Sequence, residues 1–322
     1  MPVIQLTNNY PKEVLSILNQ YIPERFELRM LSNNDYRSLE ACIGDADYLL
    51  ASGRIRIDAP LLSKAKKLKM IQRTGVGLDS LDLKAVSENG IPLYVNKAIN
   101  AESVAENTLL LILASLRKLT IIDRNTKKGI WNKQKQGITT HELKGKTIGI
   151  IGMGSIGKRL VELLKPFETT ILYYDVQQVS KEWEIENGLE YTDLKTLLRK
   201  SDVITLHCSL TEDTYHLINA ATLAYVKPDS ILINTARGGL IKTDDLIDAL
   251  QSGRLAFAGI DVYETEPVPP SETLLNLQNT ITTPHVSGIT YESFNEMMRA
   301  AINNIILFEK GYYSEIEAFR YI

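Results

Sequence analysis

Three short segments in the last third of the sequence carry side chains that can together bind an anion and transfer a proton. Arg237 precedes a pair of glycines, Glu266 follows one apolar run, and His285 follows another. A guanidinium is a planar fork that matches a carboxylate, and an imidazole exchanges protons near neutral pH. A neighbouring carboxylate would orient that imidazole and favour its protonated form. An isolated arginine is more often a surface ion pair of small energetic effect, so the combination is what indicates a reaction centre.

Other side chains compete for these roles. Glu264 lies two residues before Glu266 and is an alternative partner for His285. His207 is expected to line a cofactor site without taking part in the chemistry, and His216 is expected to face solvent. No cluster of histidine, cysteine and carboxylate residues has the spacing of metal ligands, so we predict no catalytic metal.

The strongest local motif is a glycine-rich turn, Gly152-Met153-Gly154-Ser155-Ile156-Gly157, directly after the apolar run Thr147–Ile151 and at the start of a predicted helix. In such a turn the first glycine permits the tight bend, the second admits the pyrophosphate of a dinucleotide, and the third allows close packing of the helix. The helix N-terminus would then present free N–H groups and a positive dipole end to the phosphates. The motif therefore predicts dinucleotide binding.

Asp175 indicates which dinucleotide is bound. It ends the next apolar run, at the distance of roughly 20 residues expected for the carboxylate that binds the adenine ribose. A 2′-phosphate there would bring like charges together, at a cost of about 4 kcal/mol for a pair 4 Å apart. The residues that follow, Val176–Gln178, supply no arginine to compensate. The sequence therefore predicts NAD rather than NADP as the cofactor.

Apolar runs alternate with helical patterns, which predicts an α/β fold of parallel strands. The strands predicted first are Val3–Leu6, Tyr48–Ala51, Leu68–Arg73 and Ile91–Val95, with helices at Lys12–Leu18, Pro60–Lys67 and Leu81–Glu88. A long helix is predicted from Ala101 to about Lys128. Six further strands follow, Thr147–Ile151, Thr170–Tyr174, Asp202–Leu206, Ser230–Asn234, Ala256–Ile260 and Thr280–Thr283, and then a helix at Tyr291–Glu309. The six strands match the doubly wound dinucleotide-binding pattern.

Length and composition restrict the class of protein. A chain of 322 residues exceeds the usual size of one domain, so two are expected. The net charge of -3 gives no general attraction to nucleic acid or to an anionic membrane. The most apolar run, Leu109–Leu116, is too short to cross a bilayer, and the N-terminus has no apolar stretch typical of an export signal. Two cysteines, Cys42 and Cys208, fit a reducing compartment. We therefore expect a cytoplasmic protein with a small-molecule substrate.

These groups fit one reaction. Reduction of a 2-keto acid requires a cation for the carboxylate and carbonyl, a proton donor for the developing alkoxide, and a hydride. Asp261, which follows the run Ala256–Ile260, is placed to receive the carboxamide of a nicotinamide. The sequence therefore predicts an enzyme that transfers a hydride between a nicotinamide and C2 of a small 2-hydroxy or 2-keto acid.

In these segments the sequence resembles the D-isomer-specific 2-hydroxyacid dehydrogenase family, over nearly the whole chain. The resemblance rests on Arg73-Thr74-Gly75-Val76-Gly77-Leu78-Asp79, on Asn100-Ala101-Glu102-Ser103-Val104-Ala105-Glu106, on the glycine turn, and on the segments 234–239, 259–267 and 283–288. It implies that Arg237, Glu266 and His285 form the family's catalytic triad, which favours Glu266 over Glu264.

The resemblance also implies further site residues. The backbone amides of Gly75, Val76 and Gly77 would hold the substrate carboxylate, with further substrate contacts from Ser52, Gly53 and Arg237. The implied cofactor contacts are Thr108, Gly152, Gly154, Ser155, Ile156, Gly157, Asp175, Cys208, Thr214, Thr235, Ala236, Arg237, Asp261, His285 and Gly288.

The resemblance implies two doubly wound parallel-sheet domains. A Rossmann NAD-binding domain would span residues 100–289, and a discontinuous flavodoxin-like substrate domain would combine residues 1–99 with 290–322. A homodimer is implied, joined through the cofactor domain and the long helix after Ala101. Gly53 stands where phosphoglycerate-specific members often carry arginine, and Arg54 follows it. Glycerate, glyoxylate, hydroxypyruvate and phosphoglycerate types of substrate all remain open.

Two other functions fit the same fold. One is a non-catalytic NADH-sensing interaction module of the co-repressor kind, which would bind the cofactor without turnover. The other is formate or phosphite oxidation, for which a glutamate beside a histidine is less suited, because formate oxidation transfers no proton of that kind.

Overall fold

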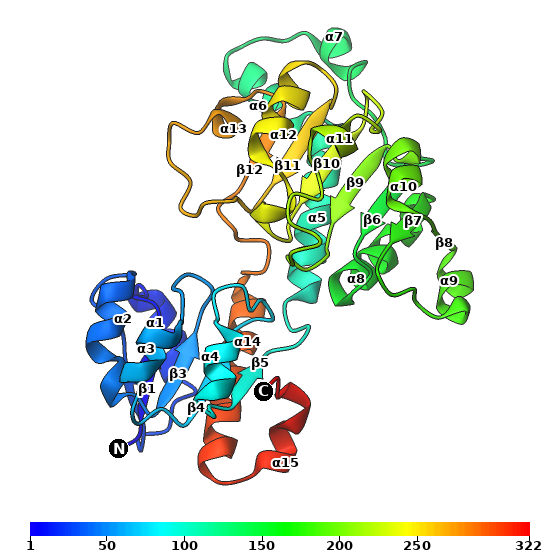
Figure 1. Ribbon diagram of the computed structural model, residues 1–322. Coiled ribbons are helices and arrows are strands. Elements are labelled where there is room, and N and C mark those ends of the chain that lie inside the picture. Colours follow the sequence, from blue (N-terminus) through cyan, green and yellow to red (C-terminus); the bar gives the residue numbers. More distant parts are fainter. The chain divides into compact units, whose positions relative to one another are not determined.

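The computed structural model describes residues 1–322, which form two compact units (Figure 1). One unit comprises residues 1–100 and 289–322, and the other comprises residues 101–288. Each unit contains one sheet, of five and of seven strands, and every strand pair in both sheets is parallel. None of the helices combines the length and the apolar composition that a membrane span requires.

The sheet of the first unit has the strand order β2-β1-β3-β4-β5, which is the flavodoxin-like order. Its strands are β1 (Val3–Leu6), β2 (Glu27–Arg29), β3 (Tyr48–Ala51), β4 (Met70–Arg73) and β5 (Leu93–Val95). Its helices are α1 (Lys12–Asn19), α2 (Tyr36–Cys42), α3 (Ala59–Lys64), α4 (Leu83–Glu88), α14 (Tyr291–Glu309) and α15 (Tyr313–Ile316).

The sheet of the second unit has the order β12-β11-β10-β9-β6-β7-β8, which is the Rossmann order with one strand added at an edge. Its strands are β6 (Thr147–Ile151), β7 (Thr170–Tyr174), β8 (Leu189–Tyr191), β9 (Val203–Leu206), β10 (Ile231–Asn234), β11 (Phe257–Ile260) and β12 (Thr280–Thr282). Its helices are α5 (Ala101–Leu116), α6 (Leu119–Lys127), α7 (Lys133–Gly137), α8 (Ser155–Leu164), α9 (Lys181–Asn187), α10 (Leu194–Lys200), α11 (Ala220–Leu223), α12 (Thr243–Gln251) and α13 (Thr273–Asn276). The expected fold class is confirmed.

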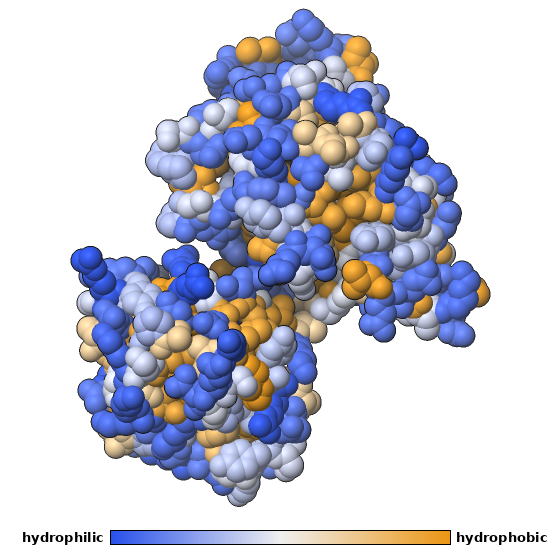
Figure 2. Space-filling model, in the orientation of Figure 1, coloured by the Kyte–Doolittle hydropathy of each residue, from blue (hydrophilic) through white to orange (hydrophobic).

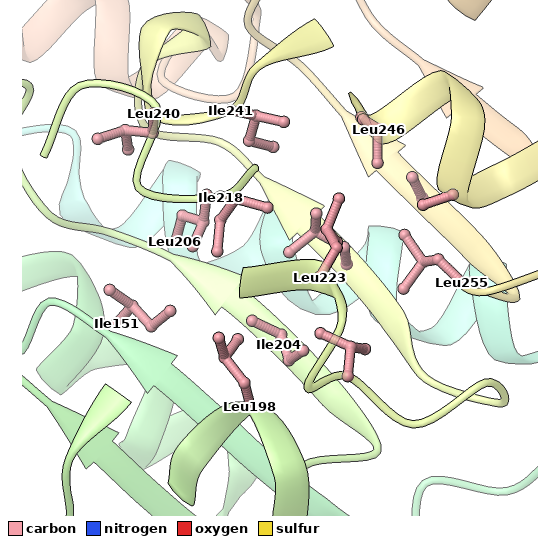
Figure 3. Close-up of a cluster of buried hydrophobic side chains, with 14 of the residues drawn as sticks. Ile151, Leu198, Ile204, Leu206, Ile218, Leu223, Leu240, Ile241, Leu246 and Leu255 are labelled. Carbon is pink, nitrogen blue, oxygen red and sulfur yellow. The ribbon is translucent and has the colours of Figure 1, made fainter. Parts of the chain in front are cut away.

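The central strands of both sheets are buried over their whole length, because helices cover both faces of a parallel sheet. All residues of β9, β10 and β11 are buried, for example. Figure 3 shows one core cluster of the seven-stranded sheet, in which Ile151, Ile204 and Leu206 from the strands pack with Leu223 and Leu246 from α11 and α12. This core fixes the strand ends from which the site is built.

The structure corrects the sequence prediction at several elements. The edge strands β2 and β8 were not predicted, because each has only three residues and lacks a continuous apolar run. The seven-stranded sheet therefore has one strand more than predicted. The long helix predicted from Ala101 is two helices, α5 and α6, separated at Lys118, which has a left-handed backbone with φ 47°. Short helices α2 and α7 were also missed.

Candidate active site

Arg237, Glu266 and His285 each follow the carboxyl end of a strand in the seven-stranded sheet. These strands, β10, β11 and β12, are neighbours and run parallel. The three segments that follow them therefore emerge side by side at the carboxyl-terminal edge of the sheet. Ligands of doubly wound folds bind outside this edge. The three predicted catalytic residues therefore belong to one group of adjacent loops within residues 101–288.

Glu266 and His285 form a hydrogen-bonded pair. Nδ1 of His285 lies 2.8 Å from Oε2 of Glu266, and Oε1 of Glu266 accepts a bond of 3.0 Å from the N–H of Tyr263. Burial alone would raise the pKa of Glu266, but the hydrogen bonds from His285 and Tyr263 and the charges of His285 and Arg237 outweigh it and lower that pKa. An ionised carboxylate only accepts hydrogen bonds, so Nδ1 donates. The second nitrogen, Nε2, is left to exchange protons on a side chain that is 46% exposed.

Asp261 shapes the turn that presents the histidine. His285 has a left-handed backbone, φ 56°, which is uncommon for a residue other than glycine. The buried Asp261 accepts a 2.7 Å bond from the N–H of His285 at its carbonyl oxygen. Its carboxylate accepts bonds from the N–H groups of Val286 and Ser287 and from the hydroxyl of Thr283. These bonds hold His285 in its unusual conformation, and a contact of Asp261 with a nicotinamide stays a prediction.

The turn that carries Arg237 is closed by Asn234, the last residue of β10. Asn234 is buried, its Nδ2 donates to the carbonyl of Arg237 at 2.9 Å, and its Oδ1 accepts from the N–H of Ala236 at 3.0 Å. Arg237 in turn donates from Nη1 to the carbonyl of Ala236 at 2.7 Å. This role of Asn234 was not predicted from the sequence, although an asparagine that ends a strand before a turn is a recognisable signal.

The glycine turn between β6 and α8 has the geometry that its sequence predicts. Gly152 has φ 99°, and a side chain there would overlap the backbone of residues 207–208. Gly154 has no atom within 4 Å of the position a Cβ would take, so a ligand can approach its backbone closely. Gly157 packs directly on the carbonyl of Gly152, and α8 lies alongside α5 (Figure 1).

Groups that fit an NAD molecule surround this turn. The N–H groups of Ser155 and Ile156, in the first turn of α8, donate to no group of the protein and can bind phosphate oxygens. At the end of β7, Oδ2 of Asp175 accepts a 2.6 Å bond from the N–H of Met153, and Oδ1 accepts one of 3.1 Å from Gln177. The carboxylate therefore lies against the glycine turn, where ribose hydroxyls are bound in this fold.

Other predicted cofactor contacts lie on α5 and in the loops after β9, β10 and β12. The hydroxyls of Thr108 and Thr235 are 2.9 Å apart and both residues are buried. Thr108 donates to the carbonyl of Val104, so Thr235 donates to Thr108. Thr214 closes the loop after β9 with a 2.7 Å bond to the carbonyl of Ser209. Ala236 and Gly288 belong to the loops of the two catalytic turns, after β10 and β12.

The two residues that follow β9 are both uncharged. Burial raises the pKa of Cys208 to about 11, so its thiol stays protonated and is a poor nucleophile. Burial lowers the pKa of His207 to about 3. Nε2 of His207 lies 2.9 Å from the hydroxyl of Thr205, and its Nδ1 is buried without a hydrogen-bond partner. A neutral histidine of this kind is suited to lining a site and not to proton transfer near pH 7.

Glu264, the alternative partner of His285, binds a different histidine. Its Oε1 lies 2.5 Å from Nε2 of His216, and its Oε2 accepts a 2.9 Å bond from the N–H of Thr243. Burial alone would raise the pKa of Glu264, but these hydrogen bonds outweigh it and lower that pKa. The prediction that His216 faces solvent is wrong, since its side chain is only 24% exposed.

No group of three or more histidine, cysteine or carboxylate side chains is arranged to hold a metal ion.

The substrate residues predicted from the sequence lie in the unit of residues 1–100 and 289–322, in loops that follow β3 and β4. The N–H groups of Gly75, Val76 and Gly77 donate to no group of the protein. Arg73, the buried last residue of β4, donates from its guanidinium to the carbonyls of Ser52 and Gly77. Successive N–H groups in a turn can bind an anion, and a contact of these three with a substrate carboxylate stays a prediction.

The two sheets, the glycine turn and the histidine–glutamate pair define a dinucleotide-dependent oxidoreductase. The family model named D-isomer specific 2-hydroxyacid dehydrogenase, NAD binding domain, matches residues 109–287. The chain belongs to the D-isomer specific 2-hydroxyacid dehydrogenase family. It is an NAD-dependent enzyme that interconverts 2-hydroxy and 2-keto acids.

Individual relatives agree with this assignment. A glyoxylate reductase of Thermofilum pendens is 39% identical over 274 residues, which are 84% of this chain and 80% of the relative. A hydroxypyruvate reductase of Thermotoga maritima is 36% identical and is matched over 85% of this chain and 89% of its own length. The crystal structure of D-lactate dehydrogenase from Aquifex aeolicus, complexed with NAD and lactic acid, has a TM-score of 0.89 at 30% identity, covering 99% of this chain and 98% of that one.

Proposed function

We propose that the protein reduces a short 2-keto acid to the D-2-hydroxy acid, with His285 as the general acid and Arg237 as the cation beside the substrate. The observation that carries this proposal is the 2.8 Å pair of His285 and Glu266 at the sheet edge that also carries Arg237. NADH held at the glycine turn and Asp175 would supply the hydride for C2 of the keto acid. Nε2 of His285 donates a proton to the oxygen on C2, and the reverse reaction returns that proton to the imidazole.

Glu266 supports the proton transfer in two ways. Its hydrogen bond fixes which nitrogen of His285 carries the permanent proton, and its charge stabilises the imidazolium before the proton is donated. The guanidinium of Arg237 is suited to polarise the carbonyl and to bind the carboxylate. Because its pKa is lowered, Glu266 stays ionised throughout the neutral pH range.

We propose that the backbone amides of Gly75, Val76 and Gly77 bind the substrate carboxylate. Their N–H groups have no partner within the protein, and Arg73 holds the loop by bonds to the carbonyls of Ser52 and Gly77. A backbone anion site binds any carboxylate, so selection among acids falls to the groups around C3. Ser52 and Gly53 are the candidates for that role, together with the exposed Arg54.

Glyoxylate and hydroxypyruvate are the substrates we favour, since two of the relatives quoted above are named for reducing them. A panel of glyoxylate, hydroxypyruvate, pyruvate and phosphohydroxypyruvate with NADH tests this choice. We expect the highest kcat/KM with glyoxylate or hydroxypyruvate. A preference for phosphohydroxypyruvate would contradict the substrate assignment but not the reaction class. Tight NADH binding with no turnover on any acid would instead favour a non-catalytic NADH sensor.

The role of His285 is tested by His285→Gln. Glutamine keeps a hydrogen-bonding side chain, but its amide cannot act as a general acid near neutral pH. We expect kcat with the best acid to fall roughly 10²–10⁴-fold, with the Kd of NADH nearly unchanged. His141→Gln, at an exposed histidine, is the matched control. A loss below tenfold, with the chemical step shown to limit the rate, would remove His285 from the role of general acid.

We propose that the protein is a homodimer joined through α5 and the α6–α7 segment. Neither α6 nor α7 buries a single residue within the chain. Large apolar side chains are exposed on and around them, namely Leu110, Leu119, Ile130, Trp131 and Ile138. Figure 2 shows hydrophobic residues among hydrophilic ones at the end of this unit that carries α7. Apolar side chains exposed together in this way are typical of a subunit interface.

Sedimentation velocity tests the dimer. We expect a dimer for the unmodified protein and a monomer for the double variant Trp131→Glu with Ile138→Lys. The control is Ile185→Lys, at an exposed isoleucine on α9. A monomeric unmodified protein, or a dimer that survives the double change, would contradict this interface.

We also propose a cytoplasmic location, which the two free thiols of Cys42 and Cys208 support.

A further inference from the structure

The loop between β11 and the catalytic glutamate carries a second histidine–glutamate pair. Glu264 and Glu266 are two residues apart, and each binds a different histidine, His216 at 2.5 Å and His285 at 2.8 Å. The chemistry proposed above uses only the second pair. The first pair is mostly buried, with side-chain exposures of 24% for His216 and 29% for Glu264.

Both members of the first pair are held firmly by their surroundings. The second oxygen of Glu264 accepts a bond from the N–H of Thr243, at the start of α12, where a helix favours a negative charge. The N–H of His216 donates to the carbonyl of Gly239 at 2.8 Å. Its imidazole stacks on the ring of Tyr215, with centroids 3.9 Å apart. Glu264 therefore ties the loop after β11 to α12 and to the loop after β9.

The same loop touches the turn of the catalytic arginine. A Cβ on Gly238, directly after Arg237, would overlap the carbonyl group of Tyr263 and the nitrogen of Glu264. The N–H of Tyr263 is also the group that donates to Oε1 of Glu266. Any shift of the backbone at residues 263–264 would therefore move both the support of the arginine turn and the backbone donor that orients Glu266.

We propose that Glu264 and His216 are positioning residues for the catalytic pair. They fix the backbone at residues 263–264, and through the N–H of Tyr263 they fix the carboxylate of Glu266 relative to His285. This inference rests on the proposed function of the second pair. It assigns to the first pair no contact with the reacting atoms.

Glu264→Ala and Glu264→Gln test the proposal together. Alanine removes both hydrogen bonds, and we expect kcat to fall by on the order of tenfold or more, because small misplacements of catalytic groups have large effects on rate. Glutamine can still accept from Thr243 and bond to His216, so we expect kcat within about threefold of the unmodified enzyme. The Kd of NADH, measured by fluorescence, is expected to stay constant. Glu212→Ala, at an exposed glutamate of the neighbouring loop, is the control.

A double-mutant cycle separates positioning from a general structural role. If Glu264 acts through Glu266, then adding Glu264→Ala to Glu266→Gln is expected to lower kcat by less than threefold further. Losses that multiply in full would overturn the proposal, and so would a Glu264→Ala enzyme with normal kcat. All assays run well below the melting temperature of each variant. If Glu264→Ala does not fold, His216→Asn, which tolerates the left-handed backbone of residue 216 (φ 52°), takes its place in both measurements with the same expectations.

The outcomes also separate this inference from the proposed function. If Glu266→Gln and His285→Gln both leave kcat unchanged, the proposed function fails. If those variants lose activity and Glu264→Ala does not, only the positioning role is overturned.

Discussion

At the scale of single residues, the carboxylate of Glu266 lies 2.8 Å from the imidazole that we propose as the proton donor. The hydrogen bonds from His285 and the N–H of Tyr263 outweigh burial and lower the pKa of Glu266, so its charge is present across the neutral range. Glu266→Gln keeps the hydrogen bond but removes the charge that favours the protonated imidazole. We therefore expect the pH profile of keto-acid reduction to move to lower pH, together with a lower kcat.

The measurement is kcat/KM for reduction between pH 5 and 9 in the unmodified enzyme and the variant. Glu212→Gln, at an exposed glutamate, controls for the loss of one surface charge. An unchanged profile in Glu266→Gln would mean that the carboxylate orients the imidazole without stabilising its proton.

His207 makes a testable contribution to stability. Burial lowers its pKa to about 3 from an ordinary 6.5. Below pH 6.5 the unfolded chain binds a proton that the folded protein does not, so the stabilisation is complete above pH 6.5 and is lost as the pH falls towards 3. Between pH 7.5 and pH 5 the loss attributable to this group is about 2 kcal/mol.

Urea denaturation of the unmodified protein and of His207→Asn at pH 7.5 and pH 5 measures this contribution. We expect the free energy of unfolding to fall between pH 7.5 and pH 5 by about 2 kcal/mol less in the variant than in the unmodified protein. His141→Asn shows the effect of losing an exposed histidine. Equal acid sensitivity of His207→Asn and the unmodified protein would show that the imidazole is hydrated in the folded state.

The residues that we propose as catalytic could be singled out from the sequence because each lies in a segment that follows a predicted strand. The residues that orient them were harder to predict. Asp261 holds the turn of His285, and Asn234 holds the turn of Arg237, through contacts that sequence spacing alone does not reveal. Spacing in the sequence alone does not show whether Glu264 or Glu266 is the partner of His285. In the folded loops Glu266 bonds to His285 and Glu264 bonds to His216.

At the scale of elements, the turn between β6 and α8 depends on Gly152. Its φ of 99° is strained for any other residue, and a side chain would also overlap the backbone of residues 207–208. Gly152→Ala is therefore expected to lower the free energy of unfolding by more than the 1–3 kcal/mol typical of backbone strain alone. We also expect the Kd of NADH to rise at least tenfold, because α8 would be displaced from the phosphates.

Gly129→Ala is the matched control for this change. Gly129 has a similar left-handed backbone, φ 75°, but no atom lies within 4 Å of the position of its Cβ. The variant thus measures strain without overlap, and NADH binding is expected to be unaffected. Equal losses of stability in the two variants would contradict the importance of the close approach between the glycine turn and the loop after β9.

The elements that the sequence predicts best are those whose periodicity reflects burial. Interior strands such as β9 and β10 are buried throughout and mostly apolar because helices cover both faces of the sheet. The edge strands β2 and β8 lack this signal, and the three residues of β2 are only partly buried. The break between α5 and α6 was missed because Lys118, which adopts the left-handed conformation, is an ordinary helix-forming residue in sequence.

At the scale of the whole molecule, each unit has its own hydrophobic core. Two apolar clusters lie within residues 101–288, and two others lie within residues 1–100 and 289–322. A chain can form such separate cores when its length exceeds the size of one domain. The sequence alternates between strands and helices twice, once for each of the two sheets. The cofactor groups at the glycine turn and at Asp175 all belong to the unit of residues 101–288.

Cofactor binding is therefore expected to stabilise the unit of residues 101–288, by an amount that grows with the logarithm of the ratio of cofactor concentration to Kd. NADH at one hundred times its Kd raises the free energy of unfolding by about 2.7 kcal/mol, if it binds only the folded state. The carboxylate of Asp175, which lies against the glycine turn, would repel a 2′-phosphate. If that repulsion weakens NADPH one-hundredfold, the same concentration of NADPH adds only about 0.4 kcal/mol.

Thermal melts with NADH and with NADPH test this difference, and Asp175→Ala identifies its source. We expect a clear rise in Tm with NADH, a small one with NADPH, and a narrower gap between the two in the variant. Val176→Ala, at the exposed neighbouring residue, controls for a change in the same loop. Equal stabilisation of the unmodified protein by both cofactors would mean that the Asp175 carboxylate does not discriminate against the 2′-phosphate.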